Sequence, residues 1–120
     1  MFHSYGQKIL YPWSYTQDKV PDWPDLQLMG EAMGREMEAA SGLRYKVGTS
    51  PDINYFASGG SDDWARGAMG IKWVFLLELP DKGSRGFLLP PDEIKPTAYS
   101  VFQGIRALAV HVSHTLVKKG

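Results

Sequence analysis

An unbroken apolar run, Trp-Val-Phe-Leu-Leu at residues 73–77, constrains the fold more than any other part of this sequence. A strand without alternating polar positions needs cover on both faces, as in the centre of an α/β sheet. We therefore predict a central strand over residues 71–79. Such a strand requires neighbouring strands and two helical layers. Because the rest of the 120 residues supplies few of either, the sequence predicts an incomplete domain.

Apolar spacing predicts a long helix after two extended segments, at residues 2–5 and 8–11. The helix should run from an N-cap at Asp22 to about Ser41, and Gly42 suits its end. Its apolar positions recur at intervals of three and four and form one stripe, which consists of Leu26, Met29, Met33, Met37 and Ala40.

The second half of the chain should hold a short strand, a loop and another long helix. Residues 45–48 fit the strand, and the small and polar residues 57–63 indicate a close-packed loop. The helix is expected to begin near Thr97. Its predicted buried face consists of Val101, Ile105, Leu108, Val112 and Leu116.

Charge and composition exclude several classes of partner. Thirteen Lys and Arg residues balance 13 Asp and Glu residues, so bulk charge does not favour nucleic acid or an anionic membrane. No apolar run approaches the roughly 20 residues that a membrane helix needs. The first ten residues lack the basic start and apolar stretch of a signal peptide, and the sequence has no cysteine.

Glu78 and His3 are the first candidates for chemistry. Glu78 follows the apolar run, where an ionised carboxylate is costly unless it is paired or lies near a metal. A strand-end glutamate that reaches solvent or pairs with a Lys or Arg is the more common arrangement. A lone histidine such as His3 is more often a hydrogen-bonded structural residue than a ligand. Catalytic zinc needs three protein ligands, which one histidine does not supply.

Two further pairs of titratable residues leave alternatives open. His111 and His114 have a spacing that can chelate a metal on a helix, but apolar neighbours favour histidines at the helix surface or boundary. Asp62 and Asp63 follow a glycine-rich stretch. Adjacent carboxylates indicate a solvated turn or a helix N-terminus, whereas one carboxylate facing a pocket would select a cationic side chain.

Several stretches, in one order along the whole chain, resemble the zinc metallocarboxypeptidases of the pancreatic A/B type. They correspond to roughly the C-terminal half of that family's catalytic domain. The matching segments are His-Ser-Tyr-x-Gln at 3–7, Ile-Leu-Tyr-Pro-Trp-Ser-Tyr-Thr at 9–16, Tyr-x-Ala-Ser-Gly-Gly-Ser-Asp-Asp-Trp-Ala at 55–65, Gly-Ile-Lys at 70–72, Glu-Leu-x-Asp-x-Gly at 78–83, Gly-Phe-Leu-Leu-Pro-Pro at 86–91 and Ile-x-Pro-Thr-Ala at 94–98.

The resemblance implies a role for each matching residue. His3 is similar to the family's third zinc ligand, and Ser4 and Tyr5 would line the substrate cleft beside it. Tyr55 corresponds to the mobile tyrosine that closes over the terminal carboxylate of the substrate. Glu78 corresponds to the general base that activates water together with zinc. A metal lowers the pKa of water and a nearby carboxylate takes its proton, so the resemblance favours catalysis by Glu78.

The resemblance also implies a substrate preference. Asp62 falls where B-type enzymes have the aspartate at the base of the specificity pocket, and Asp63 is its structural partner. Ser14 is the B-like residue at its position, and Ser50 is small where a bulky wall would suit A-type substrates. A buried carboxylate selects Lys or Arg at the substrate C-terminus, because only a cation compensates its desolvation.

The implied fold is an α/β/α sandwich around a mixed central sheet. The family's other zinc ligands, its carboxylate anchor and its oxyanion arginine lie upstream, where only Met1 and Phe2 precede His3. We therefore expect residues 1–120 to be the C-terminal part of a catalytic domain without its N-terminal half. The isolated chain should be inactive. The complete enzyme would be secreted, bind one zinc ion and act on peptide or protein C-termini.

Two alternatives stay open. The chain could be a non-catalytic remnant or a binding module, or an N-terminal half on another chain could complement it through the edge of the sheet. Alone, it should expose an apolar strand edge and helix surface. The sequence also departs from the family pattern at Pro80, at Ser84 and Arg85, and at Arg66, where the family commonly has an aromatic residue.

Overall fold

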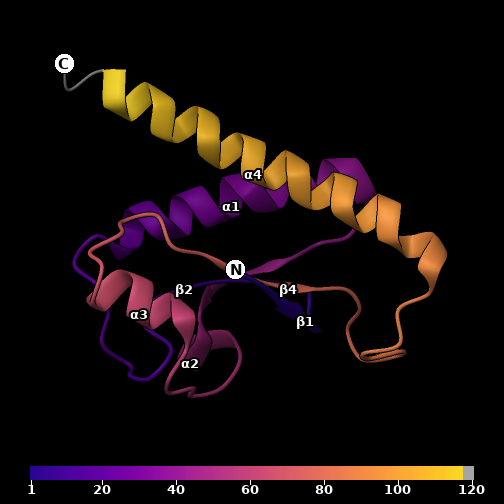
Figure 1. Cartoon of the computed structure of the whole chain (residues 1–120), viewed down its shortest axis with the longest axis horizontal. Helices are drawn as coiled ribbons and strands as arrows, with labels where there is room; N and C mark the ends of the chain where they lie inside the picture. The colour runs from indigo at the N-terminus through magenta and orange to yellow at the C-terminus, as the bar shows by residue number, and fades with distance from the viewer. Residues whose placement is uncertain (118–120) are drawn as a thin grey trace.

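The computed structural model describes residues 1–117, in which four short strands form one mixed sheet (Figure 1). The strands are β1 (Phe2–Ser4), β2 (Lys8–Tyr11), β3 (Lys46–Thr49) and β4 (Leu76–Leu79). Their order is β1-β4-β2-β3; β1 pairs with β4 and β2 with β3 in parallel, whereas β2 and β4 are antiparallel. Strand β4 therefore lies inside the sheet, as predicted.

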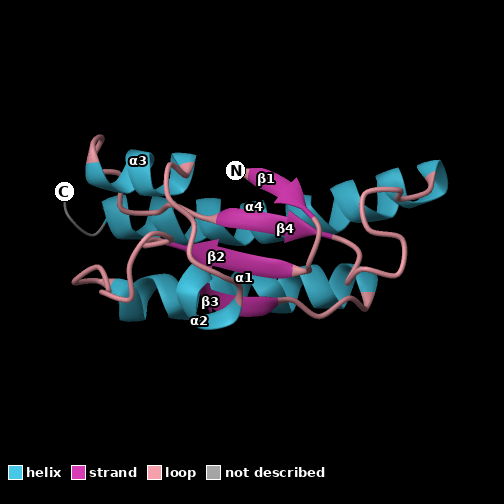
Figure 2. Cartoon of the chain, turned by 90° about the horizontal axis from the view of Figure 1, so that it is seen from below, coloured by secondary structure: helices cyan, strands magenta, loops and turns pink. Residues whose placement is uncertain are grey.

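The two long helices, α1 (Trp23–Ser41) and α4 (Ile94–Val117), cover one face of this sheet. Figure 2 shows both behind the strands. The short helices α2 (Ser50–Ile53) and α3 (Ser61–Gly67) lie on the opposite side, below the sheet in Figure 1, and a 3₁₀ turn, η1 (Pro91–Glu93), precedes α4. Residues 1–117 thus supply one full helical layer of the predicted sandwich. None of their helices combines the length and apolar character needed to cross a bilayer.

The core fills the space between the sheet and α1, as the apolar spacing predicted. Full burial of one such side chain stabilises the fold by about 1.5–3 kcal/mol. The cluster consists of Ile9, Tyr11, Val20, Leu26, Met29, Met33, Met37, Tyr45, Phe75, Leu77 and Val101. On α4 the prediction was wrong for Ile105, which is exposed because it lines an apolar hollow with Phe2 at the sheet edge. The side chain of Leu116 lies outside the described residues.

Other boundaries differ from the predictions for local reasons. The strand expected over 71–79 is reduced to β4, although Val74 and Phe75 before it are buried. Part of the predicted loop is helix α3, because its carboxylates occupy a first helical turn, where negative charge is favoured. Helix α4 begins at Ile94, three residues before Thr97, since a proline is tolerated in the first turn.

Candidate active site

The register of the sheet places His3 beside Glu78, although 75 residues separate them in the sequence. Their Cα atoms are partners across the β1–β4 pair, and His3 Nδ1 lies 3.3 Å from Glu78 Oε2. The Glu78 side chain is 10% exposed and that of His3 is 65% exposed. Because side chains alternate along a strand, Leu77 joins the core while Glu78 points away from α1 and α4.

The surroundings of Glu78 suit a proton acceptor. Of the ion pairs within residues 1–117, only the one with His3 involves the Glu78 carboxylate, so an imidazole takes the place of the solvent or of the Lys or Arg that the sequence left open. A hollow of about 350 Å³ opens next to His3 and Ser4. His3, which lines this hollow, is the neighbour of the Glu78 carboxylate. A nearly buried carboxylate whose ion-pair partner is an imidazole can act as a proton acceptor.

Lys8 flanks Glu78 on the other side and was not singled out from the sequence. It is the Cα partner of Glu78 across the β2–β4 pair, yet its Nζ donates a hydrogen bond to Asn54 Oδ1 at 2.6 Å. Asn54 precedes Tyr55 and follows α2. The bond therefore ties the segment that carries the candidate tyrosine to strand β2. Only spatial proximity, which the sequence does not encode locally, identifies this pair.

Asp62 and Ser14 form a buried polar pair. Asp62 is 1% exposed, and the Ser14 hydroxyl donates to Asp62 Oδ2 at 2.7 Å. A Cβ atom at Gly60 would collide with the other oxygen of this carboxylate, so the position requires a glycine. The sequence left open whether Asp62 is solvated or faces inward. The structure places it inside, where a charged group needs compensation.

Asp63 holds the backbone next to this pair. Its carboxylate accepts hydrogen bonds from the Ser14 N–H, at 2.9 and 3.1 Å, and from the Tyr15 N–H at 3.2 Å. Burial raises the pKa of Asp63; the Ser14 and Tyr15 N–H groups oppose that shift, and the negative charge of Asp62 adds to it. Asp63 therefore fixes the loop from which Ser14 reaches Asp62, in agreement with a structural role.

Tyr55 and Ser50 lie together at the end of α2. The Ser50 hydroxyl donates to the Tyr55 carbonyl oxygen at 2.6 Å. Two residues further on, the Ala57 N–H donates to the carbonyl oxygen of Ser14, the residue that bonds to Asp62, at 2.9 Å. Ser50 is buried, whereas Tyr55 is 63% exposed. The backbone of Tyr55 is thus anchored, whereas its side chain is exposed.

Tyr5 contacts the loop after β4 rather than Glu78 itself. Its ring meets that of Phe87 edge-on, with centroids 5.0 Å apart, and lies against the backbone of Gly86. The carboxylate of Asp81 organises the same loop by accepting hydrogen bonds from the N–H groups of Gly83, Arg85 and Gly86. Ser4, at the end of β1, is half-buried at the hollow beside His3.

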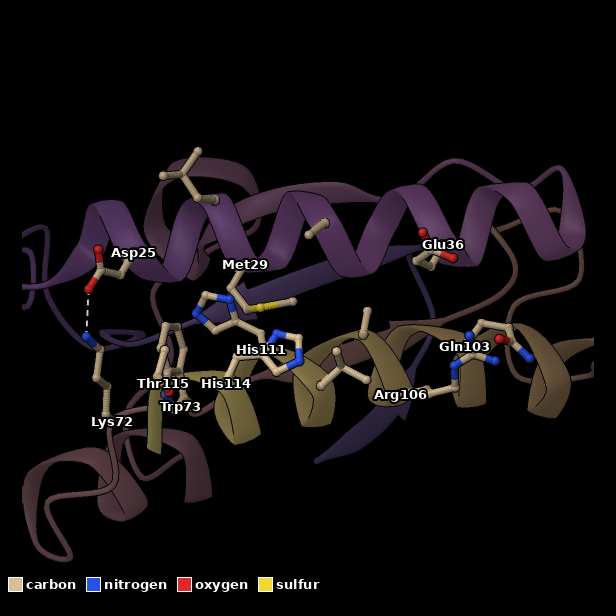
Figure 3. A pocket seen from close by; sticks show the side chains of 14 residues that line it. Asp25, Met29, Glu36, Lys72, Trp73, Gln103, Arg106, His111, His114 and Thr115 are labelled. Carbon is tan, nitrogen blue, oxygen red and sulfur yellow. Dashed lines mark hydrogen bonds and ion pairs between the residues drawn. The ribbon is translucent and has the colours of Figure 1, made fainter. Parts of the chain in front are cut away.

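A larger hollow lies elsewhere, between α1 and α4 (Figure 3). It measures about 770 Å³ and contains both His111 and His114 at its wall. Both histidines are exposed, as expected for a helix surface, and the ring of His111 meets Trp73 edge-on at 5.0 Å. In the described part of the chain no three His, Cys, Asp or Glu side chains gather as a metal site.

The candidate residues thus fall into two groups on the face opposite the long helices. His3, Ser4 and Glu78 meet at the β1–β4 pair. The second group joins the loop at residues 13–15 to α2 and α3; its members are Ser14, Ser50, Tyr55, Asp62 and Asp63.

Comparisons with known proteins identify the family of this chain. The family model for zinc carboxypeptidases matches residues 1–104. The chain is 43% identical to carboxypeptidase B of Astacus astacus over 114 residues, which are 95% of this chain and 38% of that protein. It is 39% identical to carboxypeptidase A1 of Bos taurus, of which it covers 27%.

Solved structures share the fold. Bovine thrombin-activatable fibrinolysis inhibitor, in complex with tick carboxypeptidase inhibitor, superposes with a TM-score of 0.90 at 39% identity. That match covers 95% of this chain and 38% of the solved one. Carboxypeptidase A from Helicoverpa armigera gives a TM-score of 0.80 at 28% identity. The chain thus spans 27–38% of the length of the two curated relatives, from Astacus astacus and Bos taurus, and belongs to the zinc carboxypeptidase family.

Proposed function

We propose that this chain forms part of the catalytic domain of a secreted zinc metallocarboxypeptidase, which removes Lys or Arg from the C-termini of peptides and proteins. The observation that carries the proposal is the pairing of His3 with Glu78 across β1 and β4. The exposed His3 side chain and the nearly buried Glu78 side chain meet there, and His3 also lines a hollow beside the sheet edge. Family membership agrees with this reaction class.

Glu78 is proposed as the general base. Its carboxylate accepts the proton of the water that attacks the last peptide bond. Because the Glu78 side chain is only 10% exposed, few bulk water molecules compete with the attacking water for this carboxylate. Tyr55 is proposed to close over the terminal carboxylate, which suits an exposed ring on an anchored backbone. Ser4 and Tyr5 would line the cleft next to His3.

The residues of this chain do not fit a complete zinc site. Catalytic zinc takes three protein ligands and an open position. His3 is one candidate ligand, and no three suitable side chains gather within residues 1–117. We therefore propose that the other ligands belong to a part of the catalytic domain that residues 1–120 do not include. The isolated chain is then inactive.

The surface of the chain supports an incomplete domain. Strand β1 pairs only with β4 in the described sheet, so its outer edge is free. An apolar hollow of about 470 Å³ adjoins this edge and reaches the outward face of α4; Phe2, Val101, Phe102 and Ile105 contribute to its lining. The remainder of the catalytic domain would extend the sheet from β1 and cover these side chains.

The preference for Lys or Arg rests on Asp62. Its carboxylate is buried and accepts a hydrogen bond from Ser14, and Ser50, a small residue, is buried as well. The Ser14 hydroxyl compensates the buried negative charge of Asp62 only in part, and a substrate guanidinium or ammonium would supply the positive charge that balances it. An apolar substrate side chain would leave the charge uncompensated.

A chimaera tests the proposal. Residues 1–120 would replace the matching segment of the Astacus astacus enzyme, and release of C-terminal Arg and Leu would be measured with zinc present. We expect faster release of Arg. A folded, zinc-loaded chimaera that releases neither residue would contradict the catalytic roles.

The isolated chain needs its own measurement. Purified residues 1–120 should bind zinc with less than one ion per chain and release no C-terminal Arg. Stoichiometric zinc together with release of Arg would refute the proposal that the rest of the ligand set lies elsewhere, and zinc content is measured directly by mass spectrometry.

A further inference from the structure

Arg66 joins three segments of the fold, and none of the roles given above uses it. Its side chain is 16% exposed and lies near the end of α3. One guanidinium nitrogen, Nη2, donates to the carboxylate of Asp22 at the start of α1. The other, Nη1, donates to the carbonyl oxygen of Lys72, in the segment that leads to β4, at 3.3 Å. One side chain therefore connects α3 to both α1 and the approach to β4.

The Asp22 side chain bonds to Arg66 instead of capping α1. It occupies the N-cap position of α1, yet its side chain makes no capping hydrogen bond, although an N-cap carboxylate usually accepts one from the first helical turn. The carboxylate instead receives Arg66 and lies 3.8 Å from Lys72 Nζ. Lys72 also donates to Asp25 at 2.6 Å. Two acids and two bases thus form one network at the start of α1.

Helix α3 is therefore held at both ends. Its first turn is held by Asp62 and Asp63, which bond to the loop at Ser14 and Tyr15. Its last turn is held by Arg66, one helical turn after Asp62. Because the helix has only seven residues, we expect that releasing its last turn allows the whole helix to tilt about its first turn. Any tilt moves the Asp62 carboxylate.

We propose that Arg66 is a positioning residue for Asp62: it clamps the far end of α3 to Asp22 and so sets where the specificity carboxylate sits. This inference rests on the proposed function, in which Asp62 selects a cationic C-terminal residue. Arg66 does not touch the substrate. It acts only through the orientation of α3.

Hydrogen exchange on the 120-residue chain tests the clamp. We expect Arg66→Met to speed exchange of the Ser14, Tyr15 and Trp64 N–H groups by about tenfold, while core amides of α1 keep their rates. Arg66→Lys should restore part of the protection, because an ammonium can still reach one acceptor. Arg44→Met, at an exposed ion pair with Glu38, is the matched control and should change nothing near α3. Unchanged rates, or uniformly faster exchange, would overturn the proposal.

Substrate preference in the chimaera separates positioning from general stability. A variant that is only less stable loses activity toward Arg and Leu substrates equally. Arg66→Met should instead lower the ratio of kcat/KM for C-terminal Arg over Leu, by about tenfold, since misplacing a charged group by about 1 Å costs up to roughly a hundredfold. Asp22→Asn should act in the same direction.

The two proposals fail differently in this experiment. If the unmodified chimaera shows no preference for Arg, the role of Asp62 in the proposed function is wrong. If the unmodified chimaera prefers Arg and Arg66→Met keeps the ratio, the proposed function stands and the positioning role of Arg66 is wrong.

Discussion

At the residue scale, the surroundings of Glu78 differ from those of an ordinary strand-end glutamate. It is nearly buried, and its partner is an exposed imidazole rather than a Lys or Arg. In the chimaera, Glu78→Gln should lower kcat by about 10²–10⁴-fold, because the amide cannot accept the proton of the attacking water. Glu93→Gln, at an exposed ion pair with Arg85, is the matched control and should leave kcat unchanged.

Asp62 gives a prediction on specificity. In the chimaera, Asp62→Asn should reduce kcat/KM for C-terminal Arg by roughly a hundredfold, because the cation of the substrate then enters a buried site without its counter-charge. The kcat/KM for a substrate with C-terminal Leu should stay unchanged or rise. Equal losses for both substrates would show that the substitution only disturbs the hydrogen bond with Ser14.

Asp63 gives a prediction on pH. Burial raises the pKa of folded Asp63 above its ordinary value, so the folded state favours the protonated form. The contribution of Asp63 to stability is complete below its unfolded pKa and is lost as the pH rises through its folded pKa. The stability of the wild-type chain relative to Asp63→Asn should therefore decrease over that interval, in urea denaturation at several pH values. A constant difference would contradict the shift.

Single residues also mark the limits of prediction from sequence. The positions of His3, Glu78 and Asp62 followed from the family motifs, whereas composition alone favoured structural roles for the first two. Asp22 stands at the N-cap as predicted, but Arg66 captures its carboxylate from 44 residues away. No local pattern signals such a partner.

At the element scale, the helices were the most predictable parts, because a stripe with a period near 3.6 repeats over many residues. Helix α1 ends at Ser41, and Gly42 after it adopts the left-handed conformation. The strand predicted over 71–79 was too long, since apolar residues can be buried without joining a ladder. For helix α3, the adjacent carboxylates allowed a helix N-terminus, which the structure confirms, but residues 57–63 were predicted to be a loop. Small and polar residues favour a loop locally, while the contacts of α3 to Ser14 and Asp22 are distant in sequence.

Two glycines of α1 make a matched test of how closely this helix approaches the sheet. A Cβ atom at Gly30 would lie 2.6 Å from Val47 Cγ1, whereas one at Gly34 would have 3.6 Å to its nearest neighbour on Ile9. Gly30→Ala should cost about 1–3 kcal/mol of unfolding free energy through overpacking. Gly34→Ala should stabilise by about 0.5–1 kcal/mol, the helix preference for Ala. Equal effects in thermal unfolding would contradict the difference in spacing.

At the scale of the whole molecule, the exposed apolar surface around β1 and α4 governs solution behaviour. Phe2 and Phe102 are exposed beside a free strand edge, and patches of this kind drive association. The chain should therefore self-associate in sedimentation velocity at micromolar concentration. Phe102→Lys should reduce the association, whereas Ser113→Lys, an equal charge on an exposed polar position of α4, should not. A monomer in every case would contradict this.

The alternating register of β4 carries a consequence for insertions and deletions. Leu77 faces the core and Glu78 faces His3 because neighbouring strand residues point to opposite sides. Deleting one residue within β4 would exchange these faces. The Glu78 carboxylate would then point into the apolar core and would no longer contact the His3 imidazole. The loop at residues 82–88 is outside the ladder and can change length without this penalty. Natural length variation should therefore concentrate in that loop, and β4 should keep its residue count wherever either the fold or the reaction is selected.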